Sequence, residues 1–201
     1  MLNGTIHLSE RHRMKKTFLI LIVAGLASLA GRAQDLTNDW PKTDIETFEA
    51  QTNVVIVKGI SLINTINMSS GSLSVRSKES KEPATGQVQY GMMVDFAVNG
   101  DGRERERAVV DYSELPSMLD GIDYIKKMTS DSTDMAGFEA HYATKSGFRV
   151  IAFSSRREGN VQIFLQFDNC QRIPLTSDQI SQFRDLVSSA KNSLDALQAG
   201  K

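Results

Sequence analysis

The most unusual chemistry in the sequence lies in a run where arginine and glutamate alternate. In a β-strand this run would put Arg103, Arg105 and Arg107 on one face and two glutamates on the other. A second pair, Arg156 and Arg157, lies in another predicted turn. Two arginine-bearing hairpin tips could bind a polyanion, so these five residues are the candidate binding site. The simpler interpretation is a charged hairpin end that resists edge-to-edge pairing.

His141 is the only histidine beyond the first 33 residues, and Cys170 is the only cysteine in the chain. A Cys/His pair can form a nucleophile and its base. Cys170, however, follows Asp168 and Asn169 with no glycine-rich elbow and no neighbouring base. A single cysteine also excludes a disulfide within the chain. A surface histidine is the simpler interpretation, and no catalytic residue is assigned.

The sequence Asn-Gly-Asp-Gly at residues 99–102 has the composition of a calcium loop. An EF-hand would need an oxygen ligand where Ala97 stands and a glutamate where Ala108 stands. A tight turn explains all four residues, because Asn, Asp and Gly tolerate left-handed backbone. The chain contains no Gly-Lys phosphate loop, no Gly-x-Ser-x-Gly elbow and no cysteine cluster. We therefore expect no metal and no cofactor.

Residues 1–33 are typical of a secretory signal peptide. After a basic start, residues 17–31 carry no charge, and Gly-Arg-Ala at 31–33 puts small residues at the positions that a signal peptidase reads. The uncharged stretch would span about 22 Å as a helix, less than the ~30 Å hydrocarbon core, which argues against a stable membrane anchor. We expect cleavage before Gln34, with residues 1–13 as an upstream extension. The product would be a soluble bacterial protein, periplasmic or secreted.

Removal of the signal changes the charge of the chain. The sequence has 23 basic and 24 acidic residues, of which five and one lie in the first 33, so the remainder has a net charge of about −5. Binding to a phosphate backbone draws its affinity from lysine and arginine. This acidic balance disfavours nucleic acid as a partner.

Residues 34–201 are enough for a single α+β domain with its own core. Apolar alternation is clearest at 88–98, and residues 76–86 lack apolar anchors and are predicted to be a mobile loop. The predicted elements are a short helix from Thr43 or Asp44 to Ala50, strands at 54–57, 60–66, 71–75, 88–98 and 103–112, a helix from Ser113, strands at 138–142, 148–152, 161–167 and 171–173, and a helix after Thr176.

Strands followed by a helix occur twice, which predicts antiparallel sheets with two main helices in a tandem pseudo-repeat. Residues 108–115 are roughly echoed by residues 172–179. This topology resembles that of the Whirly-type single-strand nucleic-acid binders. The resemblance has no residue motif behind it, so it bears on the fold and not on the function.

Two predicted turns set the register of their hairpins, because a slip by one residue moves every side chain to the other face. Three-residue loops at 100–102 and 145–147 end in glycine, as expected for a G1 bulge. The predicted opposite pairs are Val94 with Ala108, Met92 with Val110, Tyr90 with Tyr112 and Tyr142 with Val150. Glu104 and Glu106 then share a face with Phe96 and must project beyond the core edge into water.

The last helix has one apolar seam and a well-specified start. Thr176 and Gln179 have the spacing of a capping box, and Leu175 and Ile180 have that of a hydrophobic staple. The predicted seam is Ile180, Phe183, Val187, Ala190, Leu194 and Leu197. We expect it to pack against a sheet.

From the sequence we expect an exported, non-enzymatic binding or interaction domain whose partner is a protein or another extracellular ligand. One alternative is a hydrolase-type enzyme with a site near His141. A second alternative is a polyanion or nucleic-acid binder that uses the arginine-bearing hairpin tips.

Overall fold

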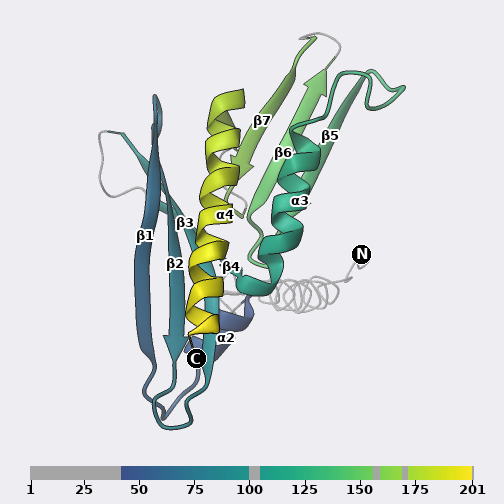
Figure 1. Cartoon of the computed structure of the whole chain (residues 1–201). Coiled ribbons are helices and arrows are strands. Elements are labelled where there is room, and N and C mark those ends of the chain that lie inside the picture. The colour runs from purple at the N-terminus through teal and green to yellow at the C-terminus, as the bar shows by residue number, and fades with distance from the viewer. Residues whose placement is uncertain (1–41, 100–104, 156–158, 169–171, 201) are drawn as a thin grey trace, which may run out of the picture. The chain divides into compact units, whose positions relative to one another are not determined.

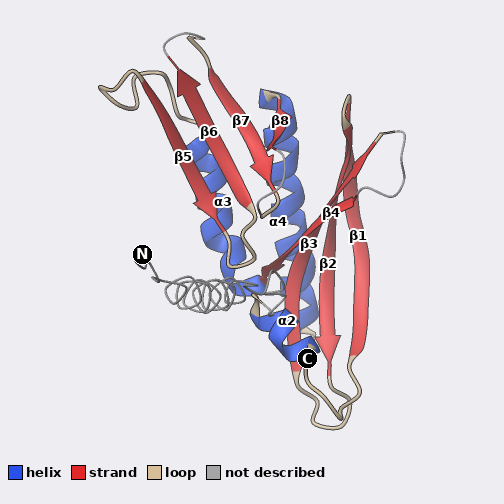
Figure 2. Ribbon diagram, turned by 180° about the vertical axis from the view of Figure 1, so that it is seen from behind, coloured by secondary structure: helices blue, strands red, loops and turns tan. Residues whose placement is uncertain are grey.

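The computed structural model describes residues 42–99, 105–155, 159–168 and 172–200. The predicted signal peptide, its cleavage site and Cys170 lie outside these ranges. Two antiparallel four-stranded sheets are present, and each is followed along the chain by a helix (Figures 1 and 2). The predicted α+β fold and its tandem strands-then-helix repeat are confirmed.

Both sheets are simple meanders in which consecutive strands are neighbours. The first half contains α2 (Asp44–Glu49), β1 (Val57–Met68), β2 (Gly71–Lys81), β3 (Val88–Val98), β4 (Arg105–Asp111), the 3₁₀ turn η1 (Tyr112–Glu114) and α3 (Leu115–Ile125). The second half contains β5 (Gly137–Ala143), β6 (Arg149–Ser155), β7 (Val161–Gln166), β8 (Arg172–Leu175) and α4 (Ser177–Ala199).

Each long helix covers the sheet that comes from the other half of the chain. Helix α3 packs on β5 and β6, α4 packs on β1, β2 and β3, and the two helices also contact each other. One continuous apolar core therefore links both sheets and both helices. The other face of the first sheet is covered by α2, where Ile45 packs with Met93 and Val109.

The seam of α4 forms as predicted for most of its length. Thr176 and Gln179 make the capping box, and the seam is buried from Ile180 to Leu194. Leu197, one turn further, is 45% exposed, so the predicted seam is one residue too long. In α3, Leu115, Met118 and Ile122 are fully buried.

Three of the four predicted opposite pairs are confirmed. Val94 lies opposite Ala108, Met92 opposite Val110 and Tyr142 opposite Val150. Gly147 has a φ of +85°, the left-handed conformation that its turn requires. Glu106 lies opposite Phe96, on the core face, and is half-buried rather than fully in water. Residues 100–104 lie outside the described ranges.

The predicted pairing of Tyr90 with Tyr112 is wrong. The ladder between β3 and β4 ends at Gly91 and Asp111, and Tyr112 already belongs to the 3₁₀ turn. The chain turns here because Glu114 accepts a hydrogen bond from the backbone N–H of Asp111.

Two predictions about the first strands are also wrong. Residues 76–81 were predicted to be loop but continue β2, because tertiary ion pairs replace the missing apolar anchors: Lys78 binds Glu49 and Arg76 binds Asp95. The strands predicted at 54–57 and 60–66 are not separate elements: β1 begins at Val57 and continues through Gly59, which pairs regularly with Glu79. Residues 54–56 lie before the strand.

Among the described residues, every helix is too short or too polar to cross a membrane.

Candidate functional site

The arginines singled out by the sequence lie mostly outside the described ranges. This applies to Arg103, Arg156 and Arg157, and of Arg105 only its backbone position in β4 is described. Arg107 lies opposite Asp95, and its Nε donates to that carboxylate at 2.5 Å. This ion pair neutralises one of the five candidate charges. The arginine surface stays a prediction.

His141 lies in the edge strand β5, opposite Ile151, and its side chain is exposed. On the same face Glu139 accepts a hydrogen bond from Arg172 at 2.7 Å. Among the described residues, no three His, Cys, Asp or Glu side chains are grouped as a metal site. The hydrolase-type site near His141 stays a prediction.

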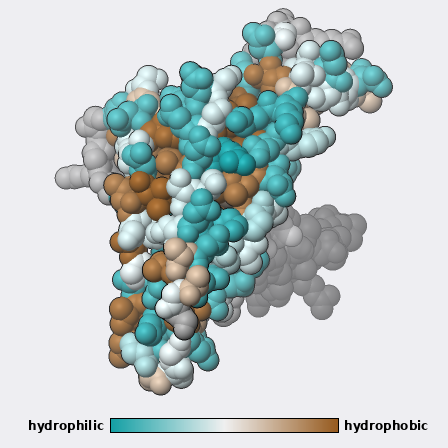
Figure 3. Space-filling view, in the orientation of Figure 1, coloured by the Kyte–Doolittle hydropathy of each residue, from teal (hydrophilic) through white to brown (hydrophobic). Residues whose placement is uncertain are grey.

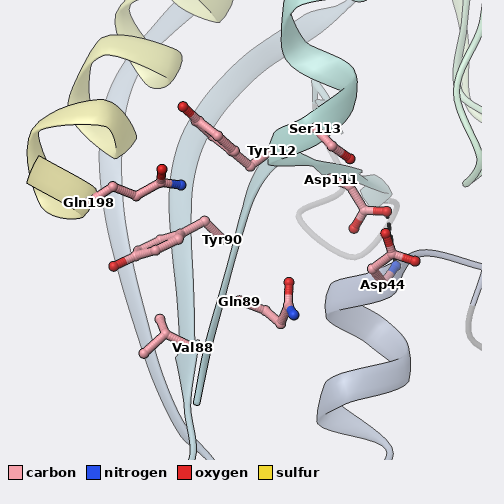
Figure 4. A pocket seen from close by; sticks show the side chains of 8 residues that line it. All are labelled: Asp44, Val88, Gln89, Tyr90, Asp111, Tyr112, Ser113 and Gln198. Atoms are coloured by element: carbon pink, nitrogen blue, oxygen red, sulfur yellow. Dashed lines mark hydrogen bonds between the residues drawn. The ribbon is translucent and has the colours of Figure 1, made fainter. Parts of the chain in front are cut away.

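A pocket of about 370 Å³ lies where β4 leaves the first sheet. Figure 4 shows the side chains that line it, with Tyr90, Tyr112 and Gln198 toward α4, and Asp44 and Asp111 on the side of α2. The remaining lining residues are Val88, Gln89 and Ser113. The size suits a small ligand. Whether the pocket can bind a ligand depends on whether its charged groups are already paired within the protein.

Asp111 binds the N-terminus of α2. Its carboxylate accepts the backbone N–H groups of Asp44 at 2.9 Å and Ile45 at 3.1 Å, so a residue from β4 supplies two of the hydrogen bonds that the first turn of a helix cannot make internally. The ammonium of Lys145, from the β5–β6 turn, binds both Asp44 at 2.8 Å and Asp111 at 3.0 Å. This cluster joins α2, β4 and the second sheet.

The same cluster is poorly suited to acid–base chemistry. Hydrogen bonds from Lys145 to Asp44 and then Asp111 raise the pKa of the Lys145 ammonium well above its ordinary value. A lysine that stays protonated at neutral pH cannot act as a general base. The cluster therefore works as a structural clamp.

Tyr112 is also engaged. Its hydroxyl donates to Asp195 at 2.5 Å, and this hydrogen bond raises the pKa of the tyrosine. Asp195 accepts a second hydrogen bond from Lys191, which lowers the pKa of the carboxyl group. The charged and hydroxyl groups around the pocket thus mainly connect elements of the fold, so the pocket is the weaker of two candidate sites.

The stronger candidate is the exposed first half of β1, the edge strand of the first sheet. Val57, Ile60 and Leu62 are 53%, 52% and 59% exposed, and Val55, just before the strand, is 71% exposed. Five of the nine large apolar side chains that are exposed among the described residues fall within residues 54–62. Figure 3 shows apolar side chains gathered along the flank where β1 runs. In the second half of β1, Ile66 and Met68 are buried in the core to which α4 contributes.

The other three sheet edges carry the usual protection against pairing with another strand. Strand β4 alternates arginine and glutamate, and β5 exposes Glu139 and His141. Strand β8 has four residues and includes Pro174, which has no N–H to donate. In contrast, β1 is twelve residues long with no proline and one charge, Lys58. Neither this length nor this exposure was predicted from the sequence, although the low charge of residues 54–68 was a usable signal.

Lys58 forms an ion pair with Glu49 of the same chain, at the end of α2. Glu49, whose side chain is 11% exposed, binds Lys58 at 2.7 Å and the buried Lys78 at 2.6 Å, and also accepts a hydrogen bond from Ser80. Burial opposes ionisation of Glu49, but the hydrogen bonds from Lys58, Lys78 and Ser80 outweigh it and lower its pKa. The one charged side chain of the exposed edge is therefore paired within its own chain, although it stays 45% exposed.

This arrangement predicts an acid-dependent contribution to stability. A carboxyl group whose pKa is lower in the folded state stabilises the fold above its unfolded pKa, near 4.5, and loses that effect as the pH falls through the folded value. We expect wild type to exceed Glu49→Gln in unfolding free energy at pH 7 and the difference to shrink below pH 4.5. Urea melts of both proteins from pH 3 to pH 7 measure this. A difference that stays constant over this range would contradict it.

No protein-family model matches the chain, and no curated protein matches it. Functional inference rests on the chain's own residues.

Proposed function

We propose that this chain is an exported, non-enzymatic interaction domain that binds an extended segment of a polypeptide along the free edge of β1. The observation that carries the proposal is the exposure of Val57, Ile60 and Leu62 on a long edge strand that lacks the charges and prolines of the other edges. Export is supported by the signal-like residues 1–33.

A polypeptide suits this edge because both its main chain and its side chains can make favourable contacts there. No described strand lies on the outer side of β1, so an added strand would extend the sheet by main-chain hydrogen bonds. Ile60 and Leu62 share one face with Lys58, and alternate apolar side chains of the added strand would pack against them. A polyanion would find one lysine here, already bound to Glu49.

Photo-crosslinking in the cells that export the protein tests this proposal. A benzophenone amino acid is placed at position 60 or 62 in two variants, and at the exposed Met135 in a control variant. We expect polypeptide adducts from positions 60 and 62 at a yield several-fold above position 135. Because side chains on one face of a strand recur every two residues, the two probes should label partner residues two apart.

The same experiment can contradict the proposal. Equal yields at all three positions would mean that the edge is not a binding surface. Adducts scattered over several partner segments would mean that the contact is not an added strand. A Leu62→Lys substitution should reduce the adducts from position 60, because it places a charge against the partner's apolar side chain.

A further inference from the structure

We infer that the strand added at β1 is β1 of a second copy of this chain, paired antiparallel about a twofold axis through Ile60. The inference rests on the proposed function, since it names the partner at the same edge. A twofold axis perpendicular to the sheet places two equal edge strands side by side in antiparallel orientation. It also keeps each side chain on its original face, so only a few registers are possible.

The β-bulge limits these registers from one side. It lies between Leu62 and Asn64, and a bulge interrupts a regular ladder. With the axis at Ile60, residues 58–62 form five consecutive pairs, all before the bulge. With the axis at Ser61, Gly59 would lie opposite the bulged residue of the other copy.

The charge on Lys58 limits the registers from the other side. An axis at Lys58 places the two lysines directly opposite, and an axis at Gly59 leaves them about 7 Å apart along the strands. An axis at Ile60 separates them by four residues, about 13 Å, which exceeds the Debye length of about 8 Å at physiological salt. Ile60 is therefore the centre that satisfies both limits.

The side chains on both faces fit this register. On the face shared by Lys58, Ile60 and Leu62, the two Ile60 side chains meet at the axis. Each Leu62 then faces a Lys58 of the other copy, and the aliphatic stem of a lysine can cover apolar surface while its ammonium stays bound to Glu49. On the opposite face Gly59 and Ser61 lie across from each other, and both are small.

The result is one continuous sheet of eight strands, a size that open sheets commonly reach. Five paired residues on each chain bury much less than the ~800 Å² per partner that is typical of stable complexes. We therefore expect a weak dimer that dissociates on dilution.

Disulfide trapping tests the register directly. In a Cys170→Ser background, single cysteines replace Ile60, Leu62 or the remote, exposed Met135. Residues directly opposite in an antiparallel pair have Cα atoms about 4.5–5.5 Å apart, within the range of a disulfide. Two Leu62→Cys thiols would be about 13 Å apart along the strands. Under mild oxidation we expect Ile60→Cys to form covalent dimers at least about tenfold faster than either control.

Equal rates for the three variants would overturn the inference, as would a faster rate for Leu62→Cys. Sedimentation of the unmodified protein gives a second readout. We expect a dimer fraction that grows with concentration, and we expect Ile60→Lys to abolish it. A purely monomeric protein at about 1 mM would also overturn the inference. Foreign polypeptide adducts at position 60 without Ile60→Cys dimers would leave the proposed function standing and refute the self-pairing alone.

Discussion

Replacing Phe183 with alanine should lower the free energy of unfolding by about 3–5 kcal/mol, the usual cost of truncating a large buried aromatic residue. Phe183 is fully buried in the middle of the α4 seam, and its ring lies 6.1 Å from that of Phe148. Phe148 in turn makes an edge contact with Phe167 at 5.0 Å. The cavity would open where α4 meets residues from the second half of the chain, so both sheets should lose support.

Urea melts measure this effect, and Leu197→Ala is the matched control. Leu197 lies on the same helix but is 45% exposed, so its truncation should change the unfolding free energy by less than about 1 kcal/mol. A loss below about 1 kcal/mol for Phe183→Ala would mean that α4 is not a core element.

Replacing Asp111 with alanine should cost about 2–3 kcal/mol, because it leaves the N–H groups of Asp44 and Ile45 without their acceptor. The Asp111 side chain is only 4% exposed, and the Ile45 hydrogen bond is buried, so water cannot easily replace the carboxylate. The loss should fall mainly on α2. We expect faster amide hydrogen exchange at Ile45 as the local signature.

The control for this prediction is Asp44→Ala, which removes the other carboxylate bound to Lys145. The Asp44 side chain is 66% exposed, and surface ion pairs contribute about 0–1 kcal/mol. The two substitutions thus separate helix anchoring from charge pairing. Equal losses for both variants would show that the ion pair, and not the anchoring of α2, is the source of stability.

The sequence alone determined the features that depend on local periodicity and turn chemistry. The capping box at Thr176 and the 3–4 spacing of the α4 seam are written in neighbouring residues, and both formed. The pairing of Tyr142 with Val150 followed from side-chain parity and from a glycine at the left-handed turn position. Two rounds of strands and a helix were enough to predict the fold class.

The candidate site could not be predicted in the same way, because it depends on which surfaces are covered. The apolar pattern of β1 indicated a strand, but the pattern does not reveal that its buried residues fall only in its second half or that its outer side has no described neighbour. The length of β2 depended on two ion pairs. Lys78 binds Glu49, which is distant in sequence, and Arg76 binds Asp95, which lies on another strand. The end of β4 depended on Asp111 meeting the N-terminus of α2. Burial and ion pairing are properties of segments brought together by folding, so only the tertiary structure decided them.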